Sequence, residues 1–174
     1  MSEVGAATAD QGRALLALYD RAVPQVYGYL VSRCGSAPVA EDLTGETFLA
    51  AVSAVRRGTV PEMTIAWLVG VARHKLVDHW RRAARDERNL QLAAEDIREM
   101  DDPWDAQLDA ARARDVLDRL GPHHRAALTL RYLDGLSVPE VADHLGRTVH
   151  ATEALLVRAR AAFRTAYGGR DDDG

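Results

Sequence analysis

The side chains best suited to binding chemistry in this sequence are cationic and aromatic, and many of them fall within residues 65–88. From residue 73 onward this stretch carries six Arg or Lys residues against three acidic ones, with two histidines and a tryptophan among them. Arginine neutralises phosphate, and aromatic rings stack on unpaired bases, so the pattern favours a nucleic-acid contact. The alternative is a solvated helix face with a tryptophan in the core.

A second candidate surface lies in residues 136–163, where two helix starts follow each other closely. Ser137 and Glu140 form a capping box, Gly146 ends a short apolar-striped helix, and Thr148 can cap a longer one. A short helix, a glycine turn and a longer helix with outward arginines are typical of a helix-turn-helix, although an ordinary helical hairpin is the alternative. The expected inner face of the second helix is Thr152, Leu156, Ala159 and Phe163.

The remaining reactive side chains do not group into a catalytic or metal site. The six histidines form no H-x-x-x-H pair beside a carboxylate, and His74 and His79 fall on different helix faces. Cys34 is the only cysteine, so an internal disulfide or a thiolate cluster is excluded and burial is expected. No glycine-rich phosphate loop or nucleophile elbow is present. We therefore expect no enzymatic activity, no metal and no cofactor.

Composition and charge describe a soluble globular protein. Its 174 residues are 47% hydrophobic, which suffices for one sizeable core or two small ones. The absence of a long apolar run and of a signal-like start predicts a cytoplasmic protein without membrane insertion. The net charge of −4 argues against a free-standing DNA binder, because such a domain is usually basic.

Three predicted helices would position the basic strip, which is the cationic and aromatic part of residues 65–88. Residues 1–12 are expected to be disordered, and residues 13–34 form an amphipathic helix with a kink or break at Pro24. A second helix covers residues 37–55 and contains Gly45, which costs roughly 1 kcal/mol relative to alanine. A short, polar, exposed loop over 56–64 then leads to the helix over 65–88, so the first domain is expected to span residues 13–88.

The rest of the chain divides into an acidic linker and a second helical domain. Residues 86–109 carry nine acidic and two basic side chains, a local charge of −7, and we expect residues 89–109 to form a flexible tether. Residues 110–167 predict a compact four-helix domain with the helix-turn-helix, followed by a frayed tail over 168–174. The predicted fold class is therefore all-α, with two small helical domains.

Four segments, taken in order, resemble the extracytoplasmic-function (ECF) sigma factors of bacterial RNA polymerase, the smallest members of the sigma-70 class. They are LYDRAVPQVYGYLVSRCG, AEDLTGETFLAAV, AWLVGVARHKLVDHWRR, and LDRLGPHHRAALTLRYLDGLSVPEVADHLG followed by VRARAAF. The resemblance covers about residues 15–166 and implies a factor that directs core polymerase to specific promoters and assists their opening in transcription initiation. It also implies three partners: core polymerase, bound through its clamp helices and flap, promoter DNA, and an anti-sigma factor.

The resemblance assigns residues to three contacts. Those for the minus-ten promoter element are Arg56, Arg57, Arg73, His74, Lys75, His79, Trp80, Arg81 and Arg82. Those for the minus-thirty-five element are Arg147, Thr148, His150, Ala151, Glu153, Ala154, Leu155 and Arg158. Those for core polymerase are Asp42, Thr44, Glu46 and Phe48. In the family, the loop before the third helix captures a flipped base, here residues 56–63, at a cost of a few kcal/mol of unstacking.

Four positions depart from the family pattern, and the first is His74, which stands where the family often has asparagine. Gly45 stands where relatives often carry glutamine, while Glu153 and Leu155 stand where many carry Lys and Arg. Glutamate can accept a hydrogen bond from the amino group of cytosine, and leucine can contact the methyl group of thymine, so the preferred base sequence is expected to differ.

A stand-alone helix-turn-helix transcriptional regulator is the alternative function. Such a regulator would bind its operator alone in a gel shift, whereas a sigma factor would bind weakly until core polymerase is added. The net negative charge and the second basic strip, on residues 65–88, favour the sigma factor.

Overall fold

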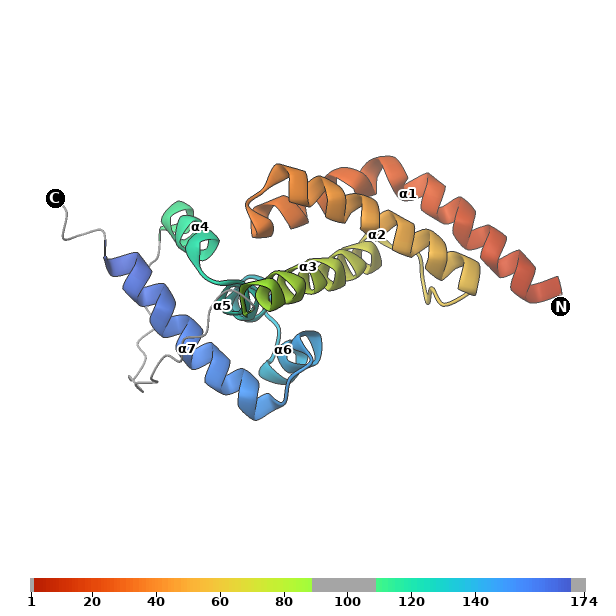
Figure 1. Ribbon diagram of the computed structural model, residues 1–174. Helices are drawn as coiled ribbons and strands as arrows, with labels where there is room; N and C mark the ends of the chain where they lie inside the picture. The colour runs from red at the N-terminus through yellow and green to blue at the C-terminus, as the bar shows by residue number, and fades with distance from the viewer. Residues whose placement is uncertain (1, 89–108, 170–174) are drawn as a thin grey trace. The chain divides into compact units, whose positions relative to one another are not determined.

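The computed structural model describes residues 2–88 and 109–169, and these residues are helical apart from short turns and loops (Figure 1). They form seven α-helices and one π-helical segment, without a β-strand among them, which confirms the all-α prediction. The chain divides into two compact units, Met1–Leu76 and Val77–Gly174, with the boundary inside helix α3. The predicted flexible tether and the tail beyond residue 169 lie outside the described residues.

Helix α1 (Ser2–Cys34) begins earlier than predicted and runs through Pro24 without a break. The expectation of a disordered segment over residues 1–12 is wrong for residues 2–12, which are helical. Alanine, the best helix former, recurs in this segment, and Gln11 Nε2 donates a hydrogen bond of 2.7 Å to the carbonyl of Val60. Around Pro24, buried Ala22 and Val26 hold α1 in the core, so packing outweighs the cost of the proline.

Helix α2 (Ala37–Arg57) runs back along α1 as the second arm of a helical hairpin (Figure 1). Gly35 adopts a left-handed conformation with φ 66°, and Ser36 caps α2 by accepting a hydrogen bond from the backbone N–H of Val39. The buried face of α2 is made by Ala40, Leu43, Thr47, Ala51, Ala54 and Val55.

Helix α3 (Ile65–Arg88) has the bounds that the sequence predicts. Thr64 caps it, because its side chain accepts a hydrogen bond of 3.1 Å from the backbone N–H of Trp67. A row of buried side chains at every fourth position follows one side of the helix: Leu68, Ala72, Leu76, Trp80 and Ala84. The opposite side is therefore left for the charged residues.

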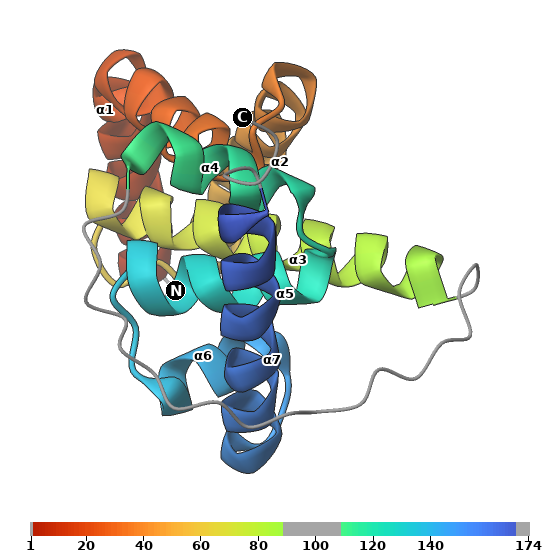
Figure 2. The ribbon, with the colours of Figure 1, turned by 90° about the vertical axis from the view of Figure 1, so that its left-hand side faces the viewer.

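The second unit contains α4 (Ala110–Arg119), α5 (Pro122–Leu128), the π-helical segment η1 (Thr129–Leu133), α6 (Val138–Leu145) and α7 (Val149–Gly168). Figure 2 shows α7 along the whole height of this unit, with α4 at its C-terminal end and α6 at its N-terminal end. Its core is a cluster of Val116, Leu128, Ala159 and Phe163. The π-helical turn, closed by a hydrogen bond from Asp134 N–H to the Thr129 carbonyl, is not foreseen by the sequence patterns.

Candidate nucleic-acid interface

The helix-turn-helix predicted from the caps is present in α6 and α7. Ser137 and Glu140 form the capping box: the N–H of Ser137 donates to Glu140 Oε2 at 2.7 Å, and the N–H of Glu140 donates to Ser137 Oγ at 3.4 Å. Gly146 ends α6 in the left-handed conformation with φ 62°. Thr148 begins α7 by accepting a hydrogen bond of 3.1 Å from the N–H of Ala151. These local bonds fix where α6 begins and ends and where α7 begins.

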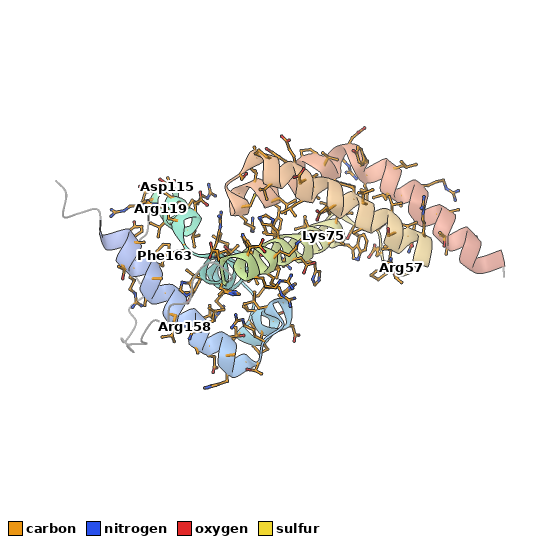
Figure 3. All side chains as sticks on the ribbon, in the orientation of Figure 1. Arg57, Lys75, Asp115, Arg119, Arg158 and Phe163 are labelled. Carbon is orange, nitrogen blue, oxygen red and sulfur yellow. The ribbon has the colours of Figure 1, made fainter. Side chains whose placement is uncertain are left out.

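The outer face of α7 carries most of the side chains assigned to the minus-thirty-five element. His150 and Glu153 are exposed, and Arg147, Ala151, Ala154 and Arg158 are half-buried. The hydroxyl of Thr148 already serves as a helix cap, so this residue contributes chiefly by fixing the start of α7. Figure 3 marks Arg158 on α7, and the same helix carries the buried Phe163.

Leu155 is not available to DNA in this structure. Only 3% of its surface is exposed, so it belongs to the core beside Leu156. The predicted contact with a thymine methyl group is therefore wrong. The physical reason is that α7 packs against α4, α5 and α6 at once, so its buried face is wider than a single stripe at three- and four-residue spacing.

The basic strip on α3 is exposed at some of its positions and half-buried at others. His74, Arg81, Arg82 and Arg85 are exposed at spacings that place them along one side of the helix, and Arg73, Lys75 and His79 are half-buried. Figure 3 marks Lys75 on α3. Trp80 is 4% exposed and continues the buried row. This tryptophan therefore lies in the core, as the alternative interpretation of the sequence expected, and its ring cannot stack on an unpaired base.

The loop between α2 and α3 is anchored rather than fully exposed. Arg56 and Arg57 are exposed at the end of α2, where Gly58 turns the chain with φ 64°. Val60, however, is only 5% exposed and packs with Ala54 and Val55, which corrects the prediction of a wholly polar loop. Half-buried Met63 and Trp67 pack on this cluster. The sequence interpretation did not select Trp67, although an aromatic residue just after a loop of this kind is a signal that could have found it.

The side chains assigned to core polymerase lie along α2. Asp42 is exposed, and Glu46 and Phe48 are half-buried. The hydroxyl of Thr44 donates to the carbonyl of Ala40 at 2.7 Å, so its proton is already used within the helix. Gly45 is exposed, and a Cβ built there meets no atom within 4 Å, so the position accepts a larger side chain.

An apolar patch on α1 and α2 is the main feature that the sequence interpretation missed. Leu16 is 78% exposed, Leu49 70%, Tyr19 48% and Val52 38%. Because residues three positions apart are neighbours on a helix surface, Leu16 lies beside Tyr19 on α1 and Leu49 beside Val52 on α2. Large apolar side chains gathered on a surface mark interaction sites more often than chance. The spacing of these apolar residues, three positions apart on each helix, was the signal that the sequence offered.

Among the described residues, no three His, Cys, Asp or Glu side chains are grouped so that they could hold a metal ion. None of the helices in this part of the chain is long and apolar enough to cross a membrane.

Comparison with known proteins identifies two regions of the chain. Residues 18–86 match the model of sigma-70 region 2, and residues 110–163 match that of sigma-70 region 4. The chain is 31% identical to the ECF RNA polymerase sigma factor SigL of Mycobacterium tuberculosis over 169 residues, covering 94% of each protein. It is 35% identical to the ECF sigma factor BldN of Streptomyces coelicolor over 164 residues, which cover 91% of this chain and 62% of that relative's length.

The fold is also found in a solved structure. The sigma factor RpoE of Bartonella quintana, determined in complex with the anti-sigma factor NepR, superposes with a TM-score of 0.53 at 20% identity over 92% of this chain and 98% of that one. At that identity, the superposition supports the fold alone. The matches to regions 2 and 4, together with the full-length relatives, establish that the chain belongs to the ECF sigma factors of bacterial RNA polymerase.

Proposed function

We propose that this sigma factor acts in the cytoplasm as a promoter-specificity subunit that binds core RNA polymerase, contacts two promoter elements and stabilises the opened minus-ten strand. It contributes no bond-making chemistry of its own. The observation that carries the proposal is that a single chain holds region 2, with an exposed basic strip on α3, and region 4, with a capped helix-turn-helix.

The minus-ten contact is assigned to the exposed side of α3 and the loop before it. Arg81 and Arg82 would neutralise backbone phosphates, with His74 nearer the N-terminal end of the same side. Trp80 is removed from the assignment because it is buried. Trp67 takes its place as the candidate stacking residue, since its ring is half-buried at the start of α3 beside Met63.

The minus-thirty-five contact is assigned to the outer face of α7. Arg147 and Arg158 supply positive charge at either end of the reading surface, and His150 and Glu153 lie between them. Glu153 can accept a hydrogen bond from the amino group of cytosine but repels phosphate, so it adds specificity and lowers overall affinity. With Leu155 buried, Glu153 becomes the principal departure from the common family pattern.

The polymerase contact is assigned to Asp42, Glu46 and the apolar patch of Leu16, Tyr19, Leu49 and Val52. Acidic side chains set the orientation and the rate of docking, while buried apolar side chains supply most of the affinity of an interface. The clamp helices of the polymerase are the proposed partner of this surface, and the flap is the proposed partner of the second unit. We also propose an anti-sigma factor that competes with polymerase.

Run-off transcription with purified core polymerase and a promoter library tests the proposal. Selective transcripts are expected only when this protein is added. Failure on every template would contradict the proposed function. The alternative, a stand-alone regulator, predicts a gel shift of its operator by the protein alone. The net charge of −4 opposes that alternative, because the protein must offset its own repulsion from DNA.

A further inference from the structure

The third turn of α1 contacts the loop that joins α2 to α3. Gln11 Nε2 donates a hydrogen bond of 2.7 Å to the carbonyl of Val60 in that loop. At the next residue of α1, a Cβ built on Gly12 meets Cγ1 of Val55 at 4.0 Å, so α1 runs close to the end of α2 here. Figure 1 shows the N-terminal half of α1 beside the C-terminal half of α2, from which the loop leaves. An early part of the chain therefore braces this loop.

The two ends of the loop are held by local hydrogen bonds, and its middle is held by Gln11. At the first end, the N–H of Thr59 donates to the carbonyl of Ala54 at 3.0 Å. At the other end, Thr64 caps α3. Within the part of the chain that the structure describes, the bond from Gln11 is the one hydrogen bond in which residues 60–63 take part. The position of the middle of the loop thus depends on α1.

Val60 connects Gln11 to Trp67, the proposed stacking residue. The side chain of Val60 is 5% exposed and packs on the last turn of α2. Met63 and Trp67, both half-buried, pack against the same cluster. Gln11 holds the carbonyl of Val60 while the cluster holds its side chain, so the residue is fixed from both sides. Because packed side chains transmit displacements to their neighbours, a shift of Val60 would move the surface on which Trp67 lies.

We propose that Gln11 is a positioning residue for capture of the unpaired minus-ten strand, because it holds Val60 and so keeps the loop and Trp67 in the arrangement that accepts a base. The inference rests on the proposed function, in which α3 and the loop before it bind the opened strand. A loop that is already ordered loses little conformational freedom when a base stacks, so the base binds more tightly. Without the bond from Gln11, part of the stacking energy must order the loop first.

The test uses the full chain with core polymerase and a promoter selected by run-off transcription. Gln11→Met removes the donor but keeps an unbranched side chain of similar length and helix propensity. Gln11→Lys keeps a donor that can reach the Val60 carbonyl, and it should behave as the wild-type protein does. Gln25→Met and Gln25→Lys are the matched controls, because Gln25 is an exposed glutamine on the same helix.

The measurement is the affinity of the holoenzyme for the single strand of the minus-ten element, first intact and then with each base in turn replaced by an abasic site. With the wild-type protein, the abasic site at the captured base should lower the affinity most. Gln11→Met should bind the intact strand about fivefold less tightly, the equivalent of one hydrogen bond. It should also lose less than the wild-type protein at that abasic site, because its capture of the base is already impaired. The two Gln25 variants should match the wild-type protein on every strand.

The comparison between intact and abasic strands separates positioning from a general loss of stability, which weakens binding of both strands alike. An equal loss for Gln11→Met and the wild-type protein at the abasic site would therefore overturn the role of Gln11. Wild-type affinity of Gln11→Met for the intact strand would overturn it as well, and so would an affinity of Gln11→Lys as low as that of Gln11→Met. If the wild-type holoenzyme is insensitive to every abasic site, or gives no transcript on any template, the proposed function fails instead.

Discussion

The rings of Tyr19 and Phe48 meet edge to face, with centroids 5.1 Å apart, and join α1 to α2 beside the apolar patch. Tyr19 itself belongs to the patch, whereas Phe48 was assigned to polymerase from the sequence. The contact therefore links an assigned residue to a surface found only in the structure. It also keeps both helices at a fixed separation, so the patch is presented as a preorganised surface.

The first prediction concerns this patch. Replacing Leu16 and Leu49 together by glutamine should weaken binding to the isolated clamp helices of the polymerase by tenfold or more, since burying each leucine is worth roughly 1.5–3 kcal/mol. Isothermal titration calorimetry would measure the affinity. The thermal midpoint should hardly change, because both side chains are largely exposed.

Leu133→Gln is the control for this experiment. Leu133 is also an exposed leucine, at 47%, but it lies in the second unit. The Leu133→Gln variant should bind the clamp helices with wild-type affinity. Wild-type affinity of the double variant as well would exclude the patch from the clamp interface.

The second prediction separates the role of α3 in promoter opening from polymerase binding. Arg81→Ala combined with Arg82→Ala should reduce open-complex formation more than binding to core polymerase, because these exposed guanidinium groups are assigned to phosphates of the opened strand. Permanganate footprinting measures opening, and a fluorescence titration measures binding. Arg21→Ala, an exposed arginine of α1, should affect neither. Equal losses of opening and binding would contradict the role of α3.

Local signals in the sequence predicted the parts of the interface that depend on local bonds. The capping box of Ser137 and Glu140, the left-handed Gly146 and the cap at Thr148 all lie where the sequence places them. Each of these features involves residues within four positions of each other, so neighbouring sequence determines them. The same reason explains why α3 begins directly after Thr64.

Features that depend on contacts distant in sequence could not be predicted in the same way. Leu155 and Leu156 are adjacent and equally apolar, and only the packing of three helices around α7 makes both of them buried. Val60 was read as part of a polar loop, but its carbonyl accepts a hydrogen bond from Gln11, 49 positions earlier. Periodicity along one helix carries no information about how many neighbours that helix has.

The third prediction tests the division of α7 between core and DNA. Leu155→Ala should destabilise the protein by about 2–5 kcal/mol, as expected for a leucine removed from a packed core. Glu153→Gln should leave the free energy of unfolding within about 0.5 kcal/mol, because Glu153 is exposed. Chemical denaturation measures both. Near-wild-type stability of Leu155→Ala would show that Leu155 lies outside the core after all.

Glu153→Gln should also change the promoter that is selected. Loss of the carboxylate removes an acceptor for the cytosine amino group and relieves repulsion from phosphate, so overall affinity should rise while discrimination at one base pair falls. Selection of minus-thirty-five sequences from a randomised library by the reconstituted holoenzyme would reveal the difference. Identical sequence preferences for the variant and the wild-type protein would remove Glu153 from the reading surface.

The last prediction concerns Gly45, the one glycine inside α2. Gly45→Ala should stabilise the protein by up to about 1 kcal/mol, because alanine restricts the unfolded chain and the Cβ meets no neighbouring atom within 4 Å. Gly45→Gln should give a smaller gain in stability but a higher affinity for the clamp helices, since it adds a polar side chain between Asp42 and Glu46, which are assigned to polymerase. Comparing the two variants separates the helix effect from the contact effect. A gain in affinity that is equal for alanine and glutamine would mean that helix stability alone limits docking, and that this position makes no polar contact with polymerase.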